Sequence, residues 1–237
     1  MLMLGMTLAD YIALMIFFGC WLGYNIAVER NLAAGSLNRT MDKYRSVWMR
    51  QLVLRENRVV DTTIMASLQS GAAFFASTSL LAIGAALTLF RSADDVLQIM
   101  SNFPLGTDVT RLGWEIKVFG LTVIFIYAFF KFSWAYRIFN YAAILVGAVP
   151  ALKVSQASEE ELAEAYEAAE RAAKMNTVAG RHFNRGQRAF FFALAYLSWF
   201  ISAYALMIAT IAVMLVMWRR QFASQVIVTT DYYTYPG

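Results

Sequence analysis

The sequence predicts an all-α, polytopic membrane protein built on a bundle of four transmembrane helices. Hydrophobic residues make up 59% of the 237 residues and charged residues only 15%, whereas an average soluble domain has about 25% charged residues. The apolar residues also come in long blocks. One of these, residues 64–90, runs for 27 residues without a formal charge, which exceeds the roughly 20 residues that cross a bilayer as a helix.

Four apolar stretches are predicted to span the membrane, within one membrane domain of residues 1–222 that is followed by a C-terminal tail, residues 223–237. The spans lie at about residues 8–28, 64–90, 116–140 and 189–218. The first lacks the positively charged start of a signal peptide, so we expect it to remain uncleaved. The third is unusually long, because a helix from Trp114 to Pro150 would measure roughly 55 Å. It either projects beyond the membrane or bends along the interface.

The basic segment between the first two spans, residues 29–61, predicts an amphipathic cytoplasmic helix. Its apolar residues recur at helical spacing, and basic residues occupy another side. This pattern is typical of a helix that lies on anionic lipid headgroups. The residues expected to contact the headgroups are Arg39, Lys43, Arg45, Trp48 and Arg50. Packing of the same helix against its own protein is the alternative, and both arrangements can hold at once.

A Glu- and Ala-rich segment between the third and fourth spans predicts a second cytoplasmic helix. Ser158 and Glu161 form a capping-box pattern at its start. Six glutamates of residues 159–170 come first and basic residues follow, which agrees with the direction of the helix dipole. Gly180 is predicted to end this helix.

The distribution of Lys and Arg sets the predicted topology. Residues 29–61 contain seven and residues 151–188 contain six, whereas the middle loop has only Arg91 and Arg111. The positive-inside rule then places the two large loops in the cytoplasm and both termini outside. The pair Arg219–Arg220, which follows the fourth span, is the one feature that disagrees.

Polar side chains within the spans are the candidates for function, because a charge in the membrane costs about 2.5–3.5 kcal/mol on insertion scales. Lys131 is expected in the inner half of the membrane, at a depth where Asp61 or Gln69 could meet it. Arg137 and Asn140 follow on the same predicted helix. These five residues predict either the lining of an ion or solute path or a buried polar network that fixes helix register.

No feature of the sequence predicts an enzyme, a cofactor or a bound metal. The single cysteine, Cys20, excludes an intramolecular disulfide and a multi-cysteine metal site, and the single histidine, His182, excludes a bis-histidine haem within one chain. Neither a nucleophile–base motif nor a Gly-rich phosphate loop occurs. Nucleic-acid binding is not expected, because the basic residues lie beside apolar spans.

Four motifs occur in order over nearly the whole chain, from about Asp10 to Trp218. They are RENRVVD (55–61), FFAST (74–78), IYAFFKFSWAYRIFNY (126–141) with GAVP (147–150), and HFNRGQRAFFFALAYLSWF (182–200). Together they resemble the domain of unknown function 599 family, which consists of bacterial and plant membrane proteins. The resemblance implies a bacterial inner-membrane location. It implies no activity, substrate or catalytic residue, since the family is uncharacterised.

Two functions fit these features. The first is an ion or small-solute channel formed between the subunits of a homo-oligomer, because four spans are few to enclose a path alone and identical subunits commonly form closed rings. The second is a non-catalytic accessory or scaffold subunit of a larger membrane complex, because the amphipathic loop, the Glu-rich helix and the aromatic tail suit contacts. The surroundings of Lys131 would distinguish them: water favours the channel, and a dry helix contact does not.

Overall fold

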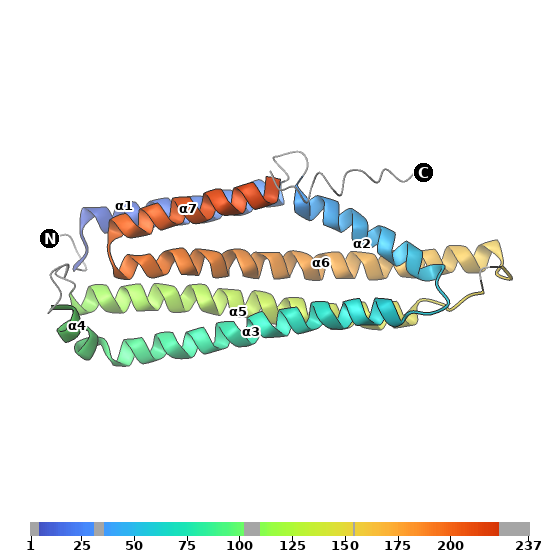
Figure 1. The fold of residues 1–237 in the computed structure, drawn as a ribbon, viewed down its shortest axis with the longest axis horizontal. Coiled ribbons are helices and arrows are strands. Elements are labelled where there is room, and N and C mark those ends of the chain that lie inside the picture. The colour runs from blue at the N-terminus through green and yellow to red at the C-terminus, as the bar shows by residue number, and fades with distance from the viewer. Residues whose placement is uncertain (1–4, 31–35, 102–109, 154, 223–237) are drawn as a thin grey trace. The chain divides into compact units, whose positions relative to one another are not determined.

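The computed structural model describes residues 5–30, 36–101, 110–153 and 155–222, and the elements in these ranges are helices (Figure 1). They are α1 (Leu8–Glu29), α2 (Leu37–Val53), α3 (Val59–Arg91), α4 (Ala93–Ser101), α5 (Arg111–Ala148), α6 (Glu159–Leu197), the 3-10 turn η2 (Ser198–Phe200) and α7 (Ala203–Phe222). The predicted C-terminal tail, residues 223–237, lies outside the described residues.

Four of the described helices are long and apolar enough to cross a membrane, which confirms the predicted fold class. They are α1, α3, α5 and α7. By their residue counts of 33 and 38, α3 and α5 are about 50 Å and about 57 Å long, more than the ~30 Å hydrocarbon core of a bilayer. The third predicted span therefore continues as one helix through Ala148, two residues before Pro150.

The fourth predicted span, residues 189–218, is not one helix, and this prediction is wrong. The chain leaves α6 after Leu197, passes through the turn η2 and enters α7 at Ala203. Two serines explain the break. The hydroxyl of Ser198 donates to the carbonyl of Ala195 at 2.6 Å, and Ser202 Oγ accepts from the backbone N–H of Ala205 at 3.1 Å. Serine side chains compete for backbone groups in this way at helix ends, and the apolar residues between them conceal the break in the sequence.

The chain divides into two compact units, to both of which α3, α5 and α6 contribute. Of the described residues, unit 1 comprises 5–30, 77–101, 110–129 and 187–222, and unit 2 comprises 36–76, 130–153 and 155–186. Each unit has its own buried apolar cluster.

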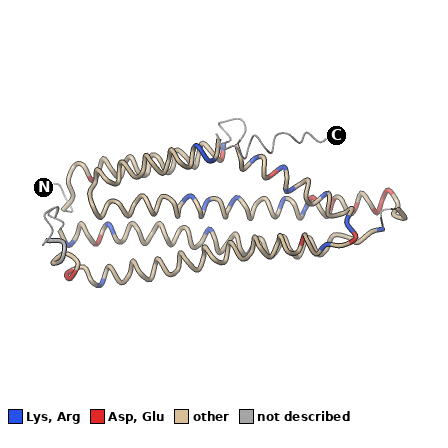
Figure 2. The backbone as a smooth tube through the Cα atoms, in the orientation of Figure 1, with Lys and Arg blue, Asp and Glu red and all other residues tan. Residues whose placement is uncertain are grey.

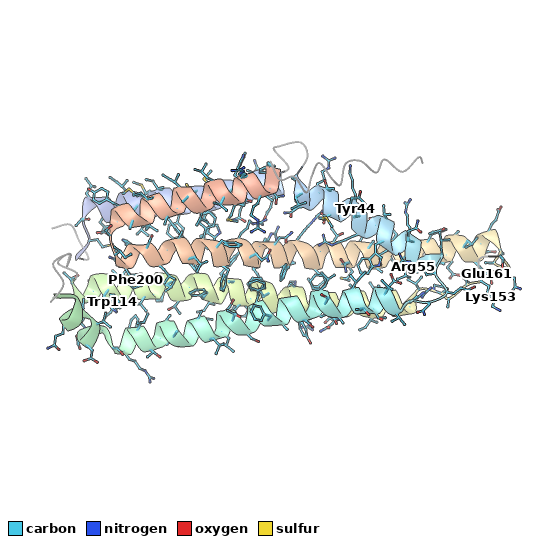
Figure 3. All side chains as sticks on the ribbon, in the orientation of Figure 1. Tyr44, Arg55, Trp114, Lys153, Glu161 and Phe200 are labelled. Atoms are coloured by element: carbon cyan, nitrogen blue, oxygen red, sulfur yellow. The ribbon has the colours of Figure 1, made fainter. Side chains whose placement is uncertain are left out.

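In unit 1, α1 packs along α7 and both helices run in the same direction. The side chain of Asp10, near the start of α1, bonds to Trp199 just before α7, and that of Tyr24 bonds to the carbonyl of Met217 near the end of α7. The last turns of α6 run opposite to α5, as Lys117 meets Trp199 and the ring of Phe125 lies 5.7 Å from that of Phe190. Trp114 and Phe200 meet edge to face at 5.0 Å (Figure 3). The large side chains of the core include Phe17, Phe192, Tyr196 and Trp199.

In unit 2, α2 and the alanine face of α6 pack with α3 and α5. The buried alanines of α6 are Ala165, Ala169, Ala172, Ala173 and Ala179. Such small side chains allow neighbouring helix backbones to approach closely. Met49 and Leu52 of α2 and Phe139 of α5 are fully or almost fully buried in the same cluster.

Candidate functional site

The carboxylate of Asp61 is the centre of a buried polar cluster at the start of α3. Its side chain is 0% exposed, and its Oδ1 accepts hydrogen bonds from Trp48 Nε1 at 2.7 Å and from Arg55 Nη1 at 2.6 Å. A buried carboxylate is stable only when it is paired and hydrogen-bonded. Arg55, labelled in Figure 3, supplies the charge, and the first turn of a helix also favours an acid.

Arg58, in the same segment, holds the end of α5. Its Nη1 donates to the carbonyl of Val149 at 2.6 Å, and its Nη2 donates to that of Pro150 at 2.7 Å. Carbonyls at the end of a helix lack partners within the helix, and a nearby cation also suits the negative end of the helix dipole. The motif RENRVVD thus ties the α2–α3 connection to α3 through Arg55 and to the end of α5 through Arg58, while Trp48 ties α2 itself to α3.

Gln69 and Asn140 form a direct polar contact between α3 and α5. The Gln69 amide donates to Asn140 Oδ1 at 2.8 Å, and the rings of Phe75 and Phe132 stack at 5.1 Å further along the same pair of helices. These contacts show that α3 and α5 run in opposite directions within unit 2. The structure therefore brings together two of the five predicted polar residues.

The other three predicted residues lie apart from this contact. Asp61 precedes Gln69 by eight residues on α3, and Lys131 precedes Asn140 by nine residues on the antiparallel α5. Along the helix axes, Lys131 lies roughly 14 Å from the level of Gln69 and roughly 25 Å from that of Asp61, so the structure does not bring it to either residue.

Arg137 takes no part in the Gln69–Asn140 contact or in the Asp61 cluster, and its side chain is exposed. Its Nε donates to the hydroxyl of Tyr141 at 2.6 Å, and its guanidinium lies over the rings of Trp134 and Tyr141. Asn140 lies only three residues further along α5, but it is partly buried and bonds to Gln69, whereas the partner of Arg137 is Tyr141.

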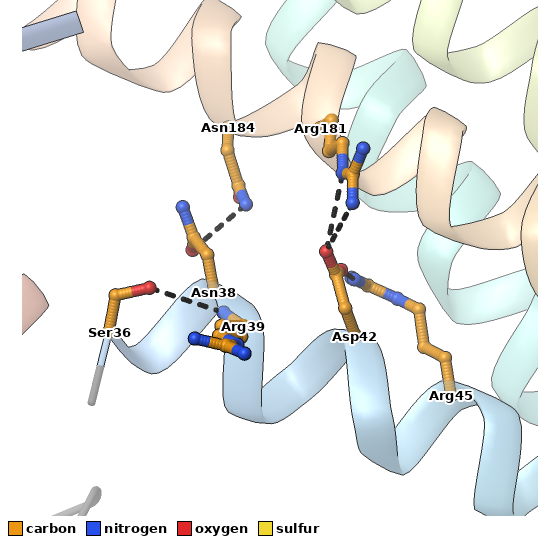
Figure 4. A network of polar contacts seen from close by, with 7 residues as sticks. All are labelled: Ser36, Asn38, Arg39, Asp42, Arg45, Arg181 and Asn184. Carbon is orange, nitrogen blue, oxygen red and sulfur yellow. Dashed lines mark hydrogen bonds and ion pairs between the residues drawn. The ribbon is translucent and has the colours of Figure 1, made fainter. Parts of the chain in front are cut away.

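A second polar network joins α2 to α6 (Figure 4). Asp42 pairs with Arg45 on its own helix at 2.7 Å and with Arg181 of α6 at 3.1 Å. One turn earlier, the amide of Asn184 donates to Asn38 Oδ1 at 3.1 Å. Burial lowers the pKa of Arg45, and the carboxylate of Asp42 counteracts part of that effect.

Gly180 provides the space for Arg45. A Cβ atom at position 180 would lie 2.5 Å from Nη2 of that guanidinium. The prediction that Gly180 ends the Glu-rich helix is wrong, since α6 continues to Leu197. The capping box at the other end is confirmed: Ser158 N–H donates to Glu161 at 2.8 Å, and this bond is the main reason that the pKa of Glu161 is lowered.

The five residues assigned to lipid headgroups separate into two groups. Trp48 and Arg45 turn inward and bond to Asp61 and Asp42. Arg39, Lys43 and Arg50 are exposed. One face of α2 therefore packs on its own protein, as the second alternative expects, and contact of the exposed basic face with lipid stays a prediction.

In unit 1, a cluster at the α6–α7 turn contains residues that the sequence did not single out as partners. Trp199 Nε1 donates to Asp10 Oδ1 at 2.7 Å, and Lys117 Nζ donates to the Trp199 carbonyl at 2.9 Å. Asp10 also completes the capping box of α1 with Thr7. The helix break leaves the carbonyl of Trp199 without a helical partner, and the buried ammonium of Lys117 replaces it.

Arg188 is a second buried cation of unit 1. Its Nε donates to Asn25 Oδ1 at 2.7 Å, and its Nη2 lies 3.5 Å from Glu29 Oε1. Only 6% of Arg188 is exposed. The one sign of this contact in the sequence is an arginine immediately before the apolar run AFFF, opposite an acid that ends another apolar run.

Comparison with known proteins confirms the resemblance of the four motifs. A family model described as Protein of unknown function, DUF599, matches residues 12–226. The match includes every cluster above except Asp10 and Thr7 of the cluster at the α6–α7 turn. No curated protein and no solved structure matches the chain.

Proposed function

Because the chain belongs to the DUF599 family, whose function is unknown, we propose from its own side chains that it is a non-catalytic accessory or scaffold protein of the membrane. The observation that carries this proposal is that polar groups expected to line a path bond to one another. Gln69 is joined to Asn140, and Asp61 is joined to Arg55 and Trp48. An ion path requires such groups to face water.

The exposed face of α2 supports a scaffold that is held at a membrane surface. Arg39, Lys43 and Arg50 are exposed, while Trp48 and Arg45 fasten the opposite face to the protein. Basic residues near the cytoplasmic leaflet contribute about 1 kcal/mol each through attraction to anionic headgroups. We assign the basic face of α2 to anionic lipid, and we expect the protein to assemble with further membrane subunits.

The parallel course of α1 and α7 supports a topology of five crossings. Because both helices run in the same direction, Arg219 and Arg220 at the end of α7 share a side with the basic residues that follow α1. Only Arg91 and Arg111 remain at the opposite side of the spans. The positive-inside rule then holds without exception, the end of α7 is cytoplasmic, and the start of α1 is not.

In this topology α6 returns the chain across the membrane, although its uncharged part is short. The side chains of Phe192, Tyr196 and Trp199 are buried in unit 1, so that little of this segment has to face lipid. Arg188 is paired with Glu29 and Asn25. Charged groups within a membrane are tolerated when they face the interior of a bundle and have partners.

Reconstitution tests the proposed function. Purified protein in liposomes is expected to pass neither cation nor anion current, and Gln69→Ala should lower thermal stability without producing one. A steady conductance whose ion selectivity changes in Gln69→Glu or Lys131→Gln would refute the scaffold. Photo-crosslinkers placed at Lys43 and Arg50 in native membranes should trap lipid or other membrane subunits. Products formed solely between copies of this chain would also contradict an accessory role.

A channel between subunits is the second candidate, and the exposed face of α3 favours it. Hydroxyl-bearing residues share that face: Thr63, Ser67, Ser70, Ser77 and Thr88. The hydroxyls of Thr63 and Thr88 already bond to carbonyls of their own helix, at 2.8 and 3.1 Å, which is how hydroxyls are satisfied in lipid as well. Modification of Ser77→Cys should block flux if this face lines a path, and should have no effect if it faces lipid.

A further inference from the structure

Arg137 is an exposed arginine of α5 that has no acidic partner in the described part of the chain. Its Nε donates to the Tyr141 hydroxyl at 2.6 Å, and its guanidinium carbon lies 5.6 Å from the ring centroids of both Trp134 and Tyr141. Among the described residues, Nη1 and Nη2 have no hydrogen-bond acceptor, and no Asp or Glu forms an ion pair with them. The two terminal nitrogens of this guanidinium are therefore available to a ligand.

No acid reaches Arg137 from the helices around it. The sequence has no Asp or Glu over residues 116–148 of α5, 62–90 of α3 and 171–220 of α6 and α7. Figure 2 shows how few charged residues lie along α3 and α5. From the contacts that α5 makes with α3 and α6, Asp61 lies roughly 16 Å and Glu170 roughly 12 Å from the level of Arg137. The earlier glutamates of α6 lie further away still.

Other acids of the described residues have partners or positions elsewhere. Their ion pairs are Asp42 with Arg45 and Arg181, Glu167 with Arg171, Glu29 with Arg188, and Asp94 and Glu115 with Arg111. Glu56 belongs to the segment that Arg58 joins to Pro150, which lies 13 residues beyond Arg137. Arg137 is thus an unpaired cation, and this favours a negatively charged ligand.

The position of Arg137 along α5 is that of a membrane boundary. It follows Glu115, near the start of the helix, by 22 residues, or roughly 33 Å, which is close to the ~30 Å of a hydrocarbon core. The exposed side chains between them are apolar or aromatic: Phe119, Val123, Ile126, Tyr127 and Phe130. Trp134, Arg137 and Tyr141 continue the face of Phe130 at spacings of four and three residues. Exposed Trp and Tyr are typical of the headgroup level.

We propose that Arg137, held by Trp134 and Tyr141, binds the phosphate group of an anionic phospholipid. Arginine offers a planar pair of donors that matches phosphate oxygens, and the two rings and the Nε bond orient that pair. The exposed apolar side chains of the same face would contact the acyl chains, which a soluble phosphate lacks. A zwitterionic headgroup brings a cation of its own, so that the unpaired arginine favours a net negative headgroup. This site is separate from the basic face of α2 and does not depend on the scaffold role.

Thermal stabilisation of the full-length protein in detergent tests the site. The background is Arg39→Gln, Lys43→Gln and Arg50→Gln, which removes the exposed basic side chains of α2, so that failure of either lipid assignment can be told from failure of the other. Phosphatidylglycerol, phosphatidylcholine and inorganic phosphate are added at equal ionic strength.

In this background we expect phosphatidylglycerol to raise Tm more than phosphatidylcholine does, and inorganic phosphate to have no effect through Arg137. Arg137→Gln should weaken the apparent affinity for phosphatidylglycerol about tenfold. Arg137→Lys retains the charge but not the planar pair of donors, so its loss should be smaller. Tyr141→Phe, which removes the acceptor of the Nε bond, should also lose less than Arg137→Gln.

Matched controls separate a binding role of Arg137 from a structural one. Lys174 is an exposed cation of α6, and Lys174→Gln should leave the affinity unchanged. Equal stabilisation by both phospholipids, or an equal loss in Lys174→Gln and Arg137→Gln, would overturn the site. So would stabilisation by inorganic phosphate that is lost in Arg137→Gln, since the ligand would then be a soluble anion. If Arg137→Gln lowers Tm by the same amount with and without phosphatidylglycerol, Arg137 acts in the fold and the proposal is wrong.

Discussion

Asp61 in unit 2 is a fully buried acid, but its charge partner, Arg55, is partly exposed. The side chain of Arg55 is 41% exposed, so water screens part of its attraction to the carboxylate. The indole of Trp48 is the second donor to the same oxygen. Removing either donor, Trp48 or Arg55, should therefore lower the free energy of unfolding on its own. Each loss should be smaller than that from breaking a fully buried ion pair.

Substitutions at this cluster should lower the stability of the whole protein. Asp61→Asn should reduce the free energy of unfolding by about 1–3 kcal/mol, which is less than the loss of a fully buried pair because Arg55 can turn to water. Trp48→Phe retains most of the ring and removes one donor, so that we expect a loss of about 1 kcal/mol. Denaturant unfolding in detergent measures both. Trp134→Phe, at an exposed tryptophan, is the control and should change little.

The imidazole of His182 predicts a pH dependence of stability. Its pKa in the folded protein is lowered, first by burial and then by Lys131 and Arg185. Below the usual histidine pKa of about 6.5, the unfolded chain binds a proton that the native state resists, so stability falls as the pH falls. In detergent, Tm should drop between about pH 7 and about pH 5. The drop should be smaller in His182→Asn, and an unchanged drop would contradict the surroundings described for this imidazole.

Among the elements, the break between α6 and α7 was the one most difficult to predict. Residues 189–218 carry no formal charge, and an apolar run of that length is the usual sign of a single span. The break depends on Ser198 and Ser202 within the run and on Lys117 from a helix far away in the sequence. Composition shows neither the hydrogen bonds nor the distant partner.

Replacing Lys117 should weaken this turn. Lys117→Met removes the donor to the Trp199 carbonyl and leaves that carbonyl buried without it, for which we expect a loss of about 1–3 kcal/mol. The gain from no longer burying an ammonium offsets part of this loss. Lys117→Arg should retain more of the stability. The free energy of unfolding, measured by denaturant unfolding in detergent, gives the comparison, and a stabilised Lys117→Met would show that the bond is dispensable.

The contact of α5 with α6 depends on the absence of a side chain at position 120. A Cβ atom there would overlap the hydroxyl of Tyr196, so Gly120→Ala should destabilise by about 1–3 kcal/mol. Tyr196→Phe removes the overlapping oxygen and should recover part of this loss in the double variant, as a double-mutant cycle would measure. Gly84→Ala is the matched control. No atom lies within 4 Å of the corresponding position, so this variant should be neutral or slightly stabilising.

For the molecule as a whole, the sequence predicted lengths and faces of helices better than contacts between them. The spans within α1, α3 and α5 and the helical segments of α2 and α6 followed from hydropathy and periodicity. Of the predicted polar set of Asp61, Gln69, Lys131, Arg137 and Asn140, the structure joins Gln69 to Asn140, because meeting across α3 and α5 depends on the register of these two helices. That register is set by the Gln69–Asn140 and Phe75–Phe132 contacts, which pattern alone does not specify.

The arrangement of unit 1 predicts a membrane topology that differs from the one predicted from the loop charges. The loop charges place both termini outside, whereas the parallel α1 and α7 place the start of α1 and the end of α7 on opposite sides. With α1 and α7 in the same direction, their starting ends share one side of the membrane and their final ends share the other. In a Cys20→Ala background, a membrane-impermeant maleimide applied to intact cells should label Leu8→Cys and Asp94→Cys. It should label Arg39→Cys and Arg219→Cys only after permeabilisation.

All four labelling positions are exposed, so that a maleimide can reach a cysteine at each of them. Leu8 and Asp94 are exposed near the starts of α1 and α4, and Arg39 and Arg219 are exposed on α2 and near the end of α7. Labelling of Leu8→Cys and Arg219→Cys from the same side would mean that an even number of segments crosses, and would contradict the parallel course of α1 and α7. Labelling from opposite sides would leave the Arg219–Arg220 pair in agreement with the other basic segments, because five crossings place all of them in the cytoplasm.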